Sequence, residues 1–398
     1  MHIRASDIRG MSRLVISATT GITDIVEGMH HTIGGGSRRS ETHGRTGGIT
    51  GFVYRSVRGV TTVVGGAIDL ALWPAAYLHR PPHSSTEREA FIAALNGVLG
   101  DHLAETGNPL ALPMALRPRP VEGEAGEVPA VTGEAPPVTG KVVVLVHGLC
   151  MNDRQWLRGG HDHGAALARD LGYTPLYLHY NSGLHISTNG RLFAQALESA
   201  LDGWPLPVDE LVIVAHSMGG LLTRSAVHAA ATAGHAWPQH LRKIVFLGTP
   251  HHGAPLERGG NWIDILLGSA PYAAPLARLG KIRSAGITDL RYGYLRDEDW
   301  AGNDRFARRA DDRAPLPLPA GVTCFAAAAA LGETPAACKG RLWGDSLVPV
   351  GSALGRHRRD AYDLGIPDDR TWVGYGMNHL DLLSRPDVYE QVRQWLAA

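Results

Sequence analysis

The chain has 398 residues, of which 44% are hydrophobic and 19% are charged, so it can bury the core of one large domain or two. Lys and Arg number 38 together and so do Asp and Glu; this balance, without a basic stripe, argues against a nucleic-acid partner. The three cysteines fit no zinc motif, and no metal or cofactor is expected; a bridge between Cys324 and Cys338 is left open.

Membrane spans and export signals are not evident in the sequence. No apolar run reaches the roughly 18 residues that a spanning helix needs. Residues 1–29 contain arginines, but Thr23, Asp24 and Glu27 interrupt their apolar run, and a small-residue cleavage site is missing. We therefore expect a cytoplasmic protein.

Residues 1–112 are expected to form an N-terminal helical region. Two stretches place apolar residues on one helical face each: Ile22, Ile25, Val26, Met29 and Ile33 in the first, and Ile49, Phe52, Val53, Val57 and Val60 in the second. A third helix is predicted from a capping box of Thr86 and Glu89 and from an apolar stripe, Phe91, Ile92, Leu95, Val98, Leu99 and Leu103.

The first two stripes are expected to pack on the main domain. Peripheral membrane contact through these helices is the alternative, although dense lysines do not flank them. Residues 113–140 are rich in Pro, Gly and Glu, which predicts an extended linker with one edge strand near residues 114–116. The oligomeric state is left open.

From Lys141 onward, short apolar runs alternate with helical patterns. Strands are predicted at 142–146, 175–180, 211–215, 244–248 and 322–330, and helices at 162–171, 188–203 and 217–233. Such alternation predicts a mostly parallel sheet with helices on both faces, in a domain spanning 141–398. Ligands of such sheets bind at the carboxyl ends of the strands.

A serine follows one of these strands in the pattern Ala215-His216-Ser217-Met218-Gly219. Small residues two positions before and after a serine permit the tight strand–turn–helix that exposes a nucleophile. The positive N-terminal end of the following helix favours negative charge beside the serine. We therefore interpret Ser217 as a nucleophile rather than an ordinary turn residue.

The stretch His147-Gly148-Leu149 follows the first strong strand of this domain. The backbone N–H groups of Leu149 and Met218 are predicted to form an oxyanion hole. Cys150 is expected to pack rather than to react.

A nucleophilic serine needs a base and an orienting carboxylate, in the chain order serine, acid, histidine. "GDSLVPV" offers Asp345, and "GMNHLDLL" offers His379 just before the last helix. His216 is expected to support the site, and His251 and His252 to lie near it. The alternative acids are Asp297, Asp299 and Asp360, each more simply explained as a solvated charge.

These motifs together give a resemblance to known families. With "VHGL" (146–149), "AHSMGG" (215–220), "LGTPHHGAP" (247–255), "GDSLVP" (344–349) and "NHLDLL" (378–383), the chain from about 141 to 395 resembles α/β-hydrolases of the lipase and esterase kind. It is similar to bacterial triacylglycerol lipases and to lipase-like proteins grouped with the GPI inositol-deacylases. The resemblance implies an α/β-hydrolase fold, a Ser217–Asp345–His379 triad and an oxyanion hole at Leu149 and Met218.

Some of these relatives bind a structural calcium ion with an aspartate at the "HLD" position, here Asp381, but a matching second carboxylate is not evident. Residues 251–318 are expected to form a helical cap insertion over the site. Trp262, Ile265, Leu266 and Tyr272 in the cap would favour an acyl chain, or would simply hold the cap down. The predicted substrate-binding residues are His147, Gly148, His216, His251, Trp262, Ile265 and Leu266.

The sequence therefore predicts a serine carboxylic-ester hydrolase that acts through an acyl-enzyme on an apolar or lipid-like ester. A thioesterase, a polyester depolymerase or an acyltransferase could use the same triad. A scaffold that binds lipid or a protein partner without catalysis is the alternative from a different class.

Overall fold

The computed structural model describes residues 4–33, 46, 48–78, 85–118, 138–254, 283–303, 311–334 and 344–398. The chain divides into two compact units, Met1–Ser84 with Leu103–Ala111, and Ser85–His102 with Leu112–Ala398. The expected division into residues 1–112, 113–140 and 141–398 stays a prediction.

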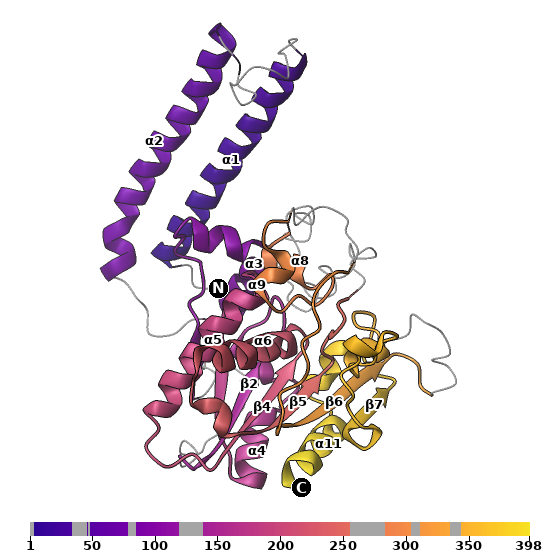
Figure 1. The fold of residues 1–398 in the computed structure, drawn as a ribbon. Helices are drawn as coiled ribbons and strands as arrows, with labels where there is room; N and C mark the ends of the chain where they lie inside the picture. The colour runs from indigo at the N-terminus through magenta and orange to yellow at the C-terminus, as the bar shows by residue number, and fades with distance from the viewer. Residues whose placement is uncertain are drawn as a thin grey trace. The chain divides into compact units, whose positions relative to one another are not determined.

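The first unit is a hairpin of two long helices, α1 (Ala5–Ile33) and α2 (Gly48–Leu78) (Figure 1). Ion pairs join the helices at two levels. Asp69 on α2 lies 2.6 Å from Arg9 and 2.7 Å from Arg13 on α1. Arg58 on α2 lies 2.6 Å from both Asp24 and Glu27 on α1. These pairs fix the two helices antiparallel to one another.

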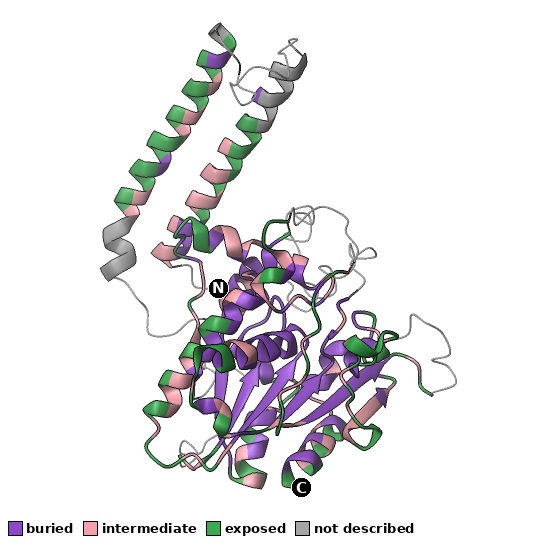
Figure 2. Cartoon of the chain, in the orientation of Figure 1, coloured by how far each residue is buried: buried purple, intermediate pink, exposed green. Residues whose placement is uncertain are grey.

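The predicted apolar stripes are not covered within this hairpin. The described side chains of both stripes are exposed (Figure 2): Ile22, Phe52, Val53, Val57 and Val60. The remaining members of the stripes have side chains outside the described set. Packing of the stripes on the main domain therefore stays a prediction. None of the described helices combines the length and the hydropathy that a membrane crossing requires.

The second unit is built on a seven-stranded sheet in the order β1-β3-β2-β4-β5-β6-β7. Its strands are β1 (Ala115–Arg117), β2 (Lys141–Val146), β3 (Thr174–His179), β4 (Glu210–His216), β5 (Leu241–Leu247), β6 (Thr323–Ala330) and β7 (Thr371–Tyr375). All neighbours are parallel except β1, which pairs antiparallel with β3 at the edge. The predicted edge strand near residues 114–116 is thus β1.

Helices cover both faces of the sheet. On one face, α4 (His163–Leu171) and α11 (Pro386–Ala397) place Leu167 and Val392 in a cluster with alternate strand residues such as Val143 and Val212. α5 (Ile186–Asp202) and α6 (Met218–Ala233) pack against each other, and α6 packs on β2 and β4. The expected mostly parallel sheet with helices on both faces is confirmed.

Shorter helices and turns connect these elements. They are α8 (Ala285–Asp289), α9 (Asp297–Trp300), α10 (Val350–Ala353) and the 3₁₀ turns η1 (Asp153–Trp156), η2 (Trp237–Gln239), η5 (Asp360–Tyr362), η6 (Asp368–Arg370) and η7 (His379–Leu383). Of the expected cap, Trp262, Ile265, Leu266 and Tyr272 lie outside the described residues, as does Cys338. Cys324 is a buried free thiol on β6.

The helix α3 (Thr86–Glu105) differs from its prediction in two ways. Its cap is Ser85 rather than Thr86, because the Ser85 hydroxyl accepts the Arg88 N–H at 3.3 Å. The helix is also buried around its circumference over residues 92–98, rather than along one stripe. The reason is that α3 is enclosed by other segments of the second unit.

Three contacts fasten α3 into the second unit. A Cβ on Gly97 would lie 2.2 Å from the Cys150 sulfur, so this helix and the loop after β2 touch directly. Ser284 Oγ donates to the Gly97 carbonyl at 2.6 Å, and Asn181 Nδ2 donates to the Gly100 carbonyl at 2.8 Å. Residues 85–102 are therefore part of the α/β body.

We predict that a chain lacking residues 1–84 folds, whereas a chain lacking residues 1–112 is strongly destabilised. Loss of the buried Ile92, Leu95 and Val98 alone should lower the free energy of unfolding by roughly 5 kcal/mol. Urea unfolding of both truncated chains, followed by circular dichroism, measures the difference. Equal stability of the two chains would show that α3 is dispensable.

Candidate active site

Ser217 lies at a sharp turn between β4 and α6. Its backbone has φ 56° and ψ −127°, a left-handed conformation that a serine adopts only where the surrounding structure enforces it. A Cβ on Gly219 would come within 2.5 Å of the Val146 carbonyl, so the motif needs a glycine there. The side chain of Ser217 is thereby presented at the carboxyl end of the sheet, as the sequence pattern predicts.

The loop after β2 passes directly beside this serine. A Cβ on Gly148 would lie 2.9 Å from Ser217 Cβ and 3.4 Å from its Oγ. The Met218 N–H belongs to the first turn of α6 and has no intrahelical acceptor. Leu149, the other predicted oxyanion-hole residue, is 2% exposed. The two predicted N–H donors thus belong to segments that meet at Ser217.

His379 is bonded to Asp345. Its Nδ1 lies 2.5 Å from Asp345 Oδ2, and both side chains are buried. The other carboxylate oxygen of Asp345 accepts the N–H groups of Leu347 at 3.0 Å and Val348 at 2.8 Å. Because a carboxylate only accepts hydrogen bonds, the proton lies on Nδ1 and leaves Nε2 as the basic nitrogen. Nε2 is buried, without a hydrogen-bond partner among the described residues.

His379 and Ser217 lie at the same edge of the sheet. The Ser217 N–H donates to the Leu247 carbonyl at 2.8 Å. The His379 ring lies over the next residue, since a Cβ on Gly248 would be 2.9 Å from His379 Cε1. The structure therefore brings His379, bonded to Asp345, against the end of β5, which is the neighbour of the strand that Ser217 follows.

Two buried histidines hold the η7 turn that carries His379. His216 Nε2 donates to the His379 carbonyl at 3.1 Å, and the two rings lie 4.7 Å apart. His163 Nε2 donates to the Leu382 carbonyl at 3.0 Å. Burial, aided by the nearby His379, lowers the pKa of His216 well below its usual value, so it stays neutral. His216 thus lies beside the ring of His379, and its predicted supporting role stays a prediction.

The alternative acids lie elsewhere. Asp297 pairs with Arg191 at 2.6 Å, and Asp360 begins an exposed 3₁₀ turn. Asp299 was expected to be a solvated charge, and this expectation is wrong. It is 6% exposed and accepts the N–H groups of Leu295 and Arg296, because it caps the start of α9.

The remaining predicted residues are held by protein contacts. The His147 ring stacks 4.2 Å from Tyr180, whose hydroxyl donates to the His147 carbonyl. His251 is buried and lies 3.5 Å from Arg224. Asp381 accepts the Asn378 N–H in a capping box, and Cys150 is a buried thiol whose pKa burial raises to about 12.

Sequence reasoning missed three residues around this edge. Tyr180 follows β3, so the rule that sites gather at strand ends could have identified it. His163 begins an ordinary amphipathic helix, and nothing in its surroundings in the sequence indicates that it bonds to residue 382. Arg224 lies within α6, where an arginine is usually exposed, yet it is 5% exposed.

We predict an acid-induced loss of stability from the buried histidines. Burial lowers the pKa of His147 to about 3 and of His163 to about 4, and burial also holds the pKa values of His216 and His251 well below the usual value. Below pH about 6.5 these histidines bind protons in the unfolded chain but remain neutral in the folded chain. Stability should therefore be full above that pH and fall by up to about 1.4 kcal/mol per pH unit for each such histidine.

Urea unfolding measured from about pH 8 to about pH 4.5 tests this slope. A His163→Gln variant should show a shallower fall than the unaltered chain. Stability that stays constant down to about pH 4.5 would contradict buried neutral histidines.

Comparisons with known proteins agree with this architecture. Residues 137–314 match the family model described as the PGAP1-like alpha/beta domain. No curated protein matches the chain in sequence.

Several solved structures resemble the chain in fold at low identity. The mature lipase BlEst2 of Bacillus licheniformis is 19% identical over 64% of this chain and 91% of its own, with a TM-score of 0.41. Lipase B of Aspergillus fumigatus is 9% identical over 65% of this chain and 52% of its own, with a TM-score of 0.38. A metagenomic carboxyl esterase is 16% identical over 82% of this chain and 98% of its own, with a TM-score of 0.37. The resemblance predicted from the motifs agrees with the match of residues 137–314 to the PGAP1-like alpha/beta domain model.

Proposed function

We propose that the chain is a serine carboxylic-ester hydrolase that acts through an acyl-enzyme. The observation that carries this proposal is the 2.5 Å bond between His379 Nδ1 and Asp345, at the strand ends where Ser217 occupies its strained turn. A buried carboxylate–imidazole pair with an unoccupied Nε2 is the arrangement that a serine needs for activation.

In the first half of the reaction, Ser217 Oγ attacks the ester carbonyl carbon while His379 Nε2 accepts the hydroxyl proton. Asp345 keeps the imidazole in the reactive tautomer and stabilises the imidazolium that forms. The carbonyl oxygen becomes an oxyanion, which the N–H groups of Leu149 and Met218 would stabilise, each by about 3 kcal/mol.

In the second half, the tetrahedral intermediate collapses and the leaving alcohol takes the proton from His379. Water then attacks the acyl-enzyme, with His379 Nε2 again acting as the base. Release of the carboxylic acid regenerates the Ser217 hydroxyl.

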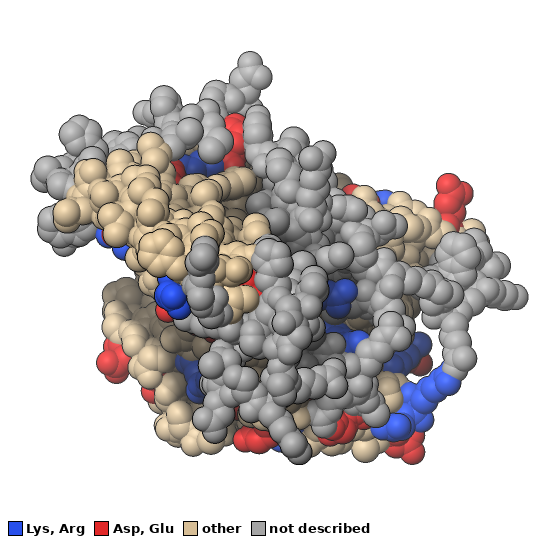
Figure 3. All heavy atoms as spheres, turned by 90° about the horizontal axis from the view of Figure 1, so that it is seen from above, with Lys and Arg blue, Asp and Glu red and all other residues tan. Residues whose placement is uncertain are grey.

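An apolar or lipid-like ester is the proposed substrate class. The side chains predicted to contact an acyl chain, Trp262, Ile265 and Leu266, lie outside the described residues. Exposed apolar side chains on the α1–α2 hairpin, such as Phe52 and Val60, are compatible with the alternative of peripheral membrane contact. Where residues are described, charges of both signs are interspersed on the face seen in Figure 3, which suits a neutral substrate better than a polyanion. A cytoplasmic location stays a prediction.

We predict that hydrolysis of p-nitrophenyl esters disappears in Ser217→Ala. The loss in kcat should be at least about a thousandfold, because the variant retains only oxyanion stabilisation and binding. Ser199→Ala, on the exposed side of α5, is the matched control and should keep full activity. A fluorophosphonate probe should label the unaltered chain at Ser217. Activity of Ser217→Ala at the level of the control, with the probe unreactive, would instead favour a scaffold without catalysis.

We also predict that Asp345→Asn lowers kcat by about a thousandfold or more, with KM little changed. The amide can donate to Nδ1, which shifts the imidazole proton to Nε2 and removes the base. Asp387→Asn, at the exposed start of α11, is the control. Initial rates on a short-chain ester give kcat and KM for both variants. An unchanged kcat in Asp345→Asn would rule out this residue as the partner of the base.

A further inference from the structure

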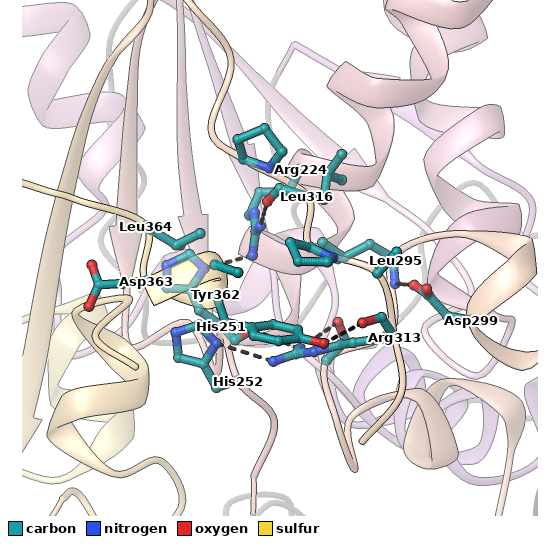
Figure 4. Close-up of a pocket in the computed structure, with 15 residues that line it drawn as sticks. Arg224, His251, His252, Leu295, Asp299, Arg313, Leu316, Tyr362, Asp363 and Leu364 are labelled. Atoms are coloured by element: carbon teal, nitrogen blue, oxygen red, sulfur yellow. Dashed lines mark hydrogen bonds between the residues drawn. The ribbon is translucent and has the colours of Figure 1, made fainter. Parts of the chain in front are cut away.

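A cavity of about 260 Å³ lies in the second unit (Figure 4). Arg224 from α6, His251 and His252 from the loop after β5, Arg313 and Tyr362 are among the residues that line it. Ser217, Asp345 and His379 are not among the described residues that line this cavity. Its wall thus gathers two guanidinium groups that the proposed reaction does not use.

Arg224 is the unusual member of this group. It is 5% exposed, and its side chain donates to the Leu316 carbonyl and lies 3.5 Å from His251 Nδ1. Its Nε has no hydrogen-bond partner, and no carboxylate pairs with it among the described residues. Burial, aided by the charge of Arg313, lowers its pKa to about 9, so Arg224 remains cationic at neutral pH. A buried unpaired cation is costly unless an anion accompanies it.

Arg313 is anchored by contrast. It donates to the backbone carbonyls of Tyr292 and Gly293, and its Nε lies 3.3 Å from Asp311 Oδ1. Its guanidinium stands 5.4 Å from the centre of the Tyr362 ring. Arg313 therefore has a fixed position and a carboxylate partner, and it adds positive potential beside Arg224.

The acidic side chains of the wall are already occupied. Asp299 accepts the N–H groups of Leu295 and Arg296. Asp363 accepts the N–H groups of His357 at 3.0 Å and Gly365 at 2.8 Å. Neither carboxylate pairs with Arg224, so its charge has no counterion from this wall.

His251 supplies a second unused donor. Its Nδ1 faces an Arg224 N–H, which places the imidazole proton on Nε2. That Nε2 is buried and has no partner among the described residues. The Nε–H of Arg224 and the Nε2–H of His251 are thus two buried donors, from neighbouring side chains of one cavity.

We propose that this cavity binds a phosphate group, either free or as the phosphate of a lipid headgroup, with Arg224 and His251 as its ligands and Arg313 as a nearby positive charge. Guanidinium and imidazole N–H groups match the acceptor oxygens of phosphate, and charge-assisted bonds in a desolvated site are strong. The cavity is larger than one phosphate, so a glycerol-sized group attached to the phosphate also fits. The site is additional to the proposed triad and does not depend on its activity.

Binding is tested on the full chain with two probes. The first is inorganic phosphate, compared with chloride at equal ionic strength, in isothermal titration and thermal unfolding. The second is a set of vesicles of phosphatidylcholine with and without phosphatidic acid, in a flotation assay. Binding of inorganic phosphate identifies the free ion as sufficient, and binding of the phosphatidic acid vesicles alone identifies a headgroup. If neither inorganic phosphate nor the phosphatidic acid vesicles bind, the proposal is overturned.

The variants Arg224→Gln and Arg224→Lys locate the site, with the exposed Arg169→Gln as control. The probe that binds the unaltered chain is called the active probe. Arg224→Gln should weaken its binding at least tenfold, and Arg224→Lys should weaken it less. The control should leave binding unchanged. With phosphate as the active probe, the difference in Tm between Arg224→Gln and the unaltered chain should grow with phosphate concentration. A difference that is independent of phosphate, or equal binding by all three variants, would show that Arg224 is only structural.

Hydrogen exchange of the unaltered chain keeps the proposal testable if both Arg224 variants unfold. The probe that binds should slow exchange in the segments 293–299 and 313–317, which contain the lining residues Gly293, Leu295, Asp299, Arg313, Ala314 and Leu316. Unchanged exchange in these segments, with binding still observed, would place the ligand elsewhere and overturn the assignment.

Discussion

The candidate site depends on the register of three parallel strands. Val146 at the end of β2 lies opposite Ala215 of β4, and His216 at the end of β4 lies opposite Leu247 of β5. The three strands therefore end at one level, and the residues that follow them meet. The chain also reverses direction in the sheet around β2, placing β3 on one side and β4 on the other. Such a reversal opens a crevice at the strand ends, which is where Gly148 and Ser217 come together.

Electrostatics around this edge are arranged in two different ways. At the proposed triad, the carboxylate and the turn that carries the base have defined partners: Asp345 receives two backbone N–H groups and the imidazole proton, and neutral histidines hold the turn of His379. At Arg224 the arrangement is incomplete, because a guanidinium is buried without a carboxylate among the described residues. Buried hydrogen bonds with satisfied partners rigidify a site, whereas a buried charge without a partner indicates a place where a ligand can bind.

The sheet, the serine turn and the acid–base pair were predictable because each follows from local rules. Continuous apolar runs predict buried parallel strands, and "HSMGG" needs its glycines wherever a strand turns sharply into a helix. The α3 cap was displaced by one residue because Ser85 and Thr86 are both good capping residues, and only geometry distinguishes them. The burial of Asp299 and Arg224, and the bond from His163 to residue 382, were beyond local rules, since they depend on segments distant in the chain.

The position of α3 has a consequence for synthesis on the ribosome. This helix emerges early, yet the residues that enclose it, Cys150, Asn181 and Ser284, are made much later. An apolar helix that waits for its enclosure is prone to aggregation, so nascent chains of this protein should need shielding by a chaperone until the middle of the sheet has been translated. The packing of α3 against these residues is thus a late step that needs long-range contacts, rather than a local folding event.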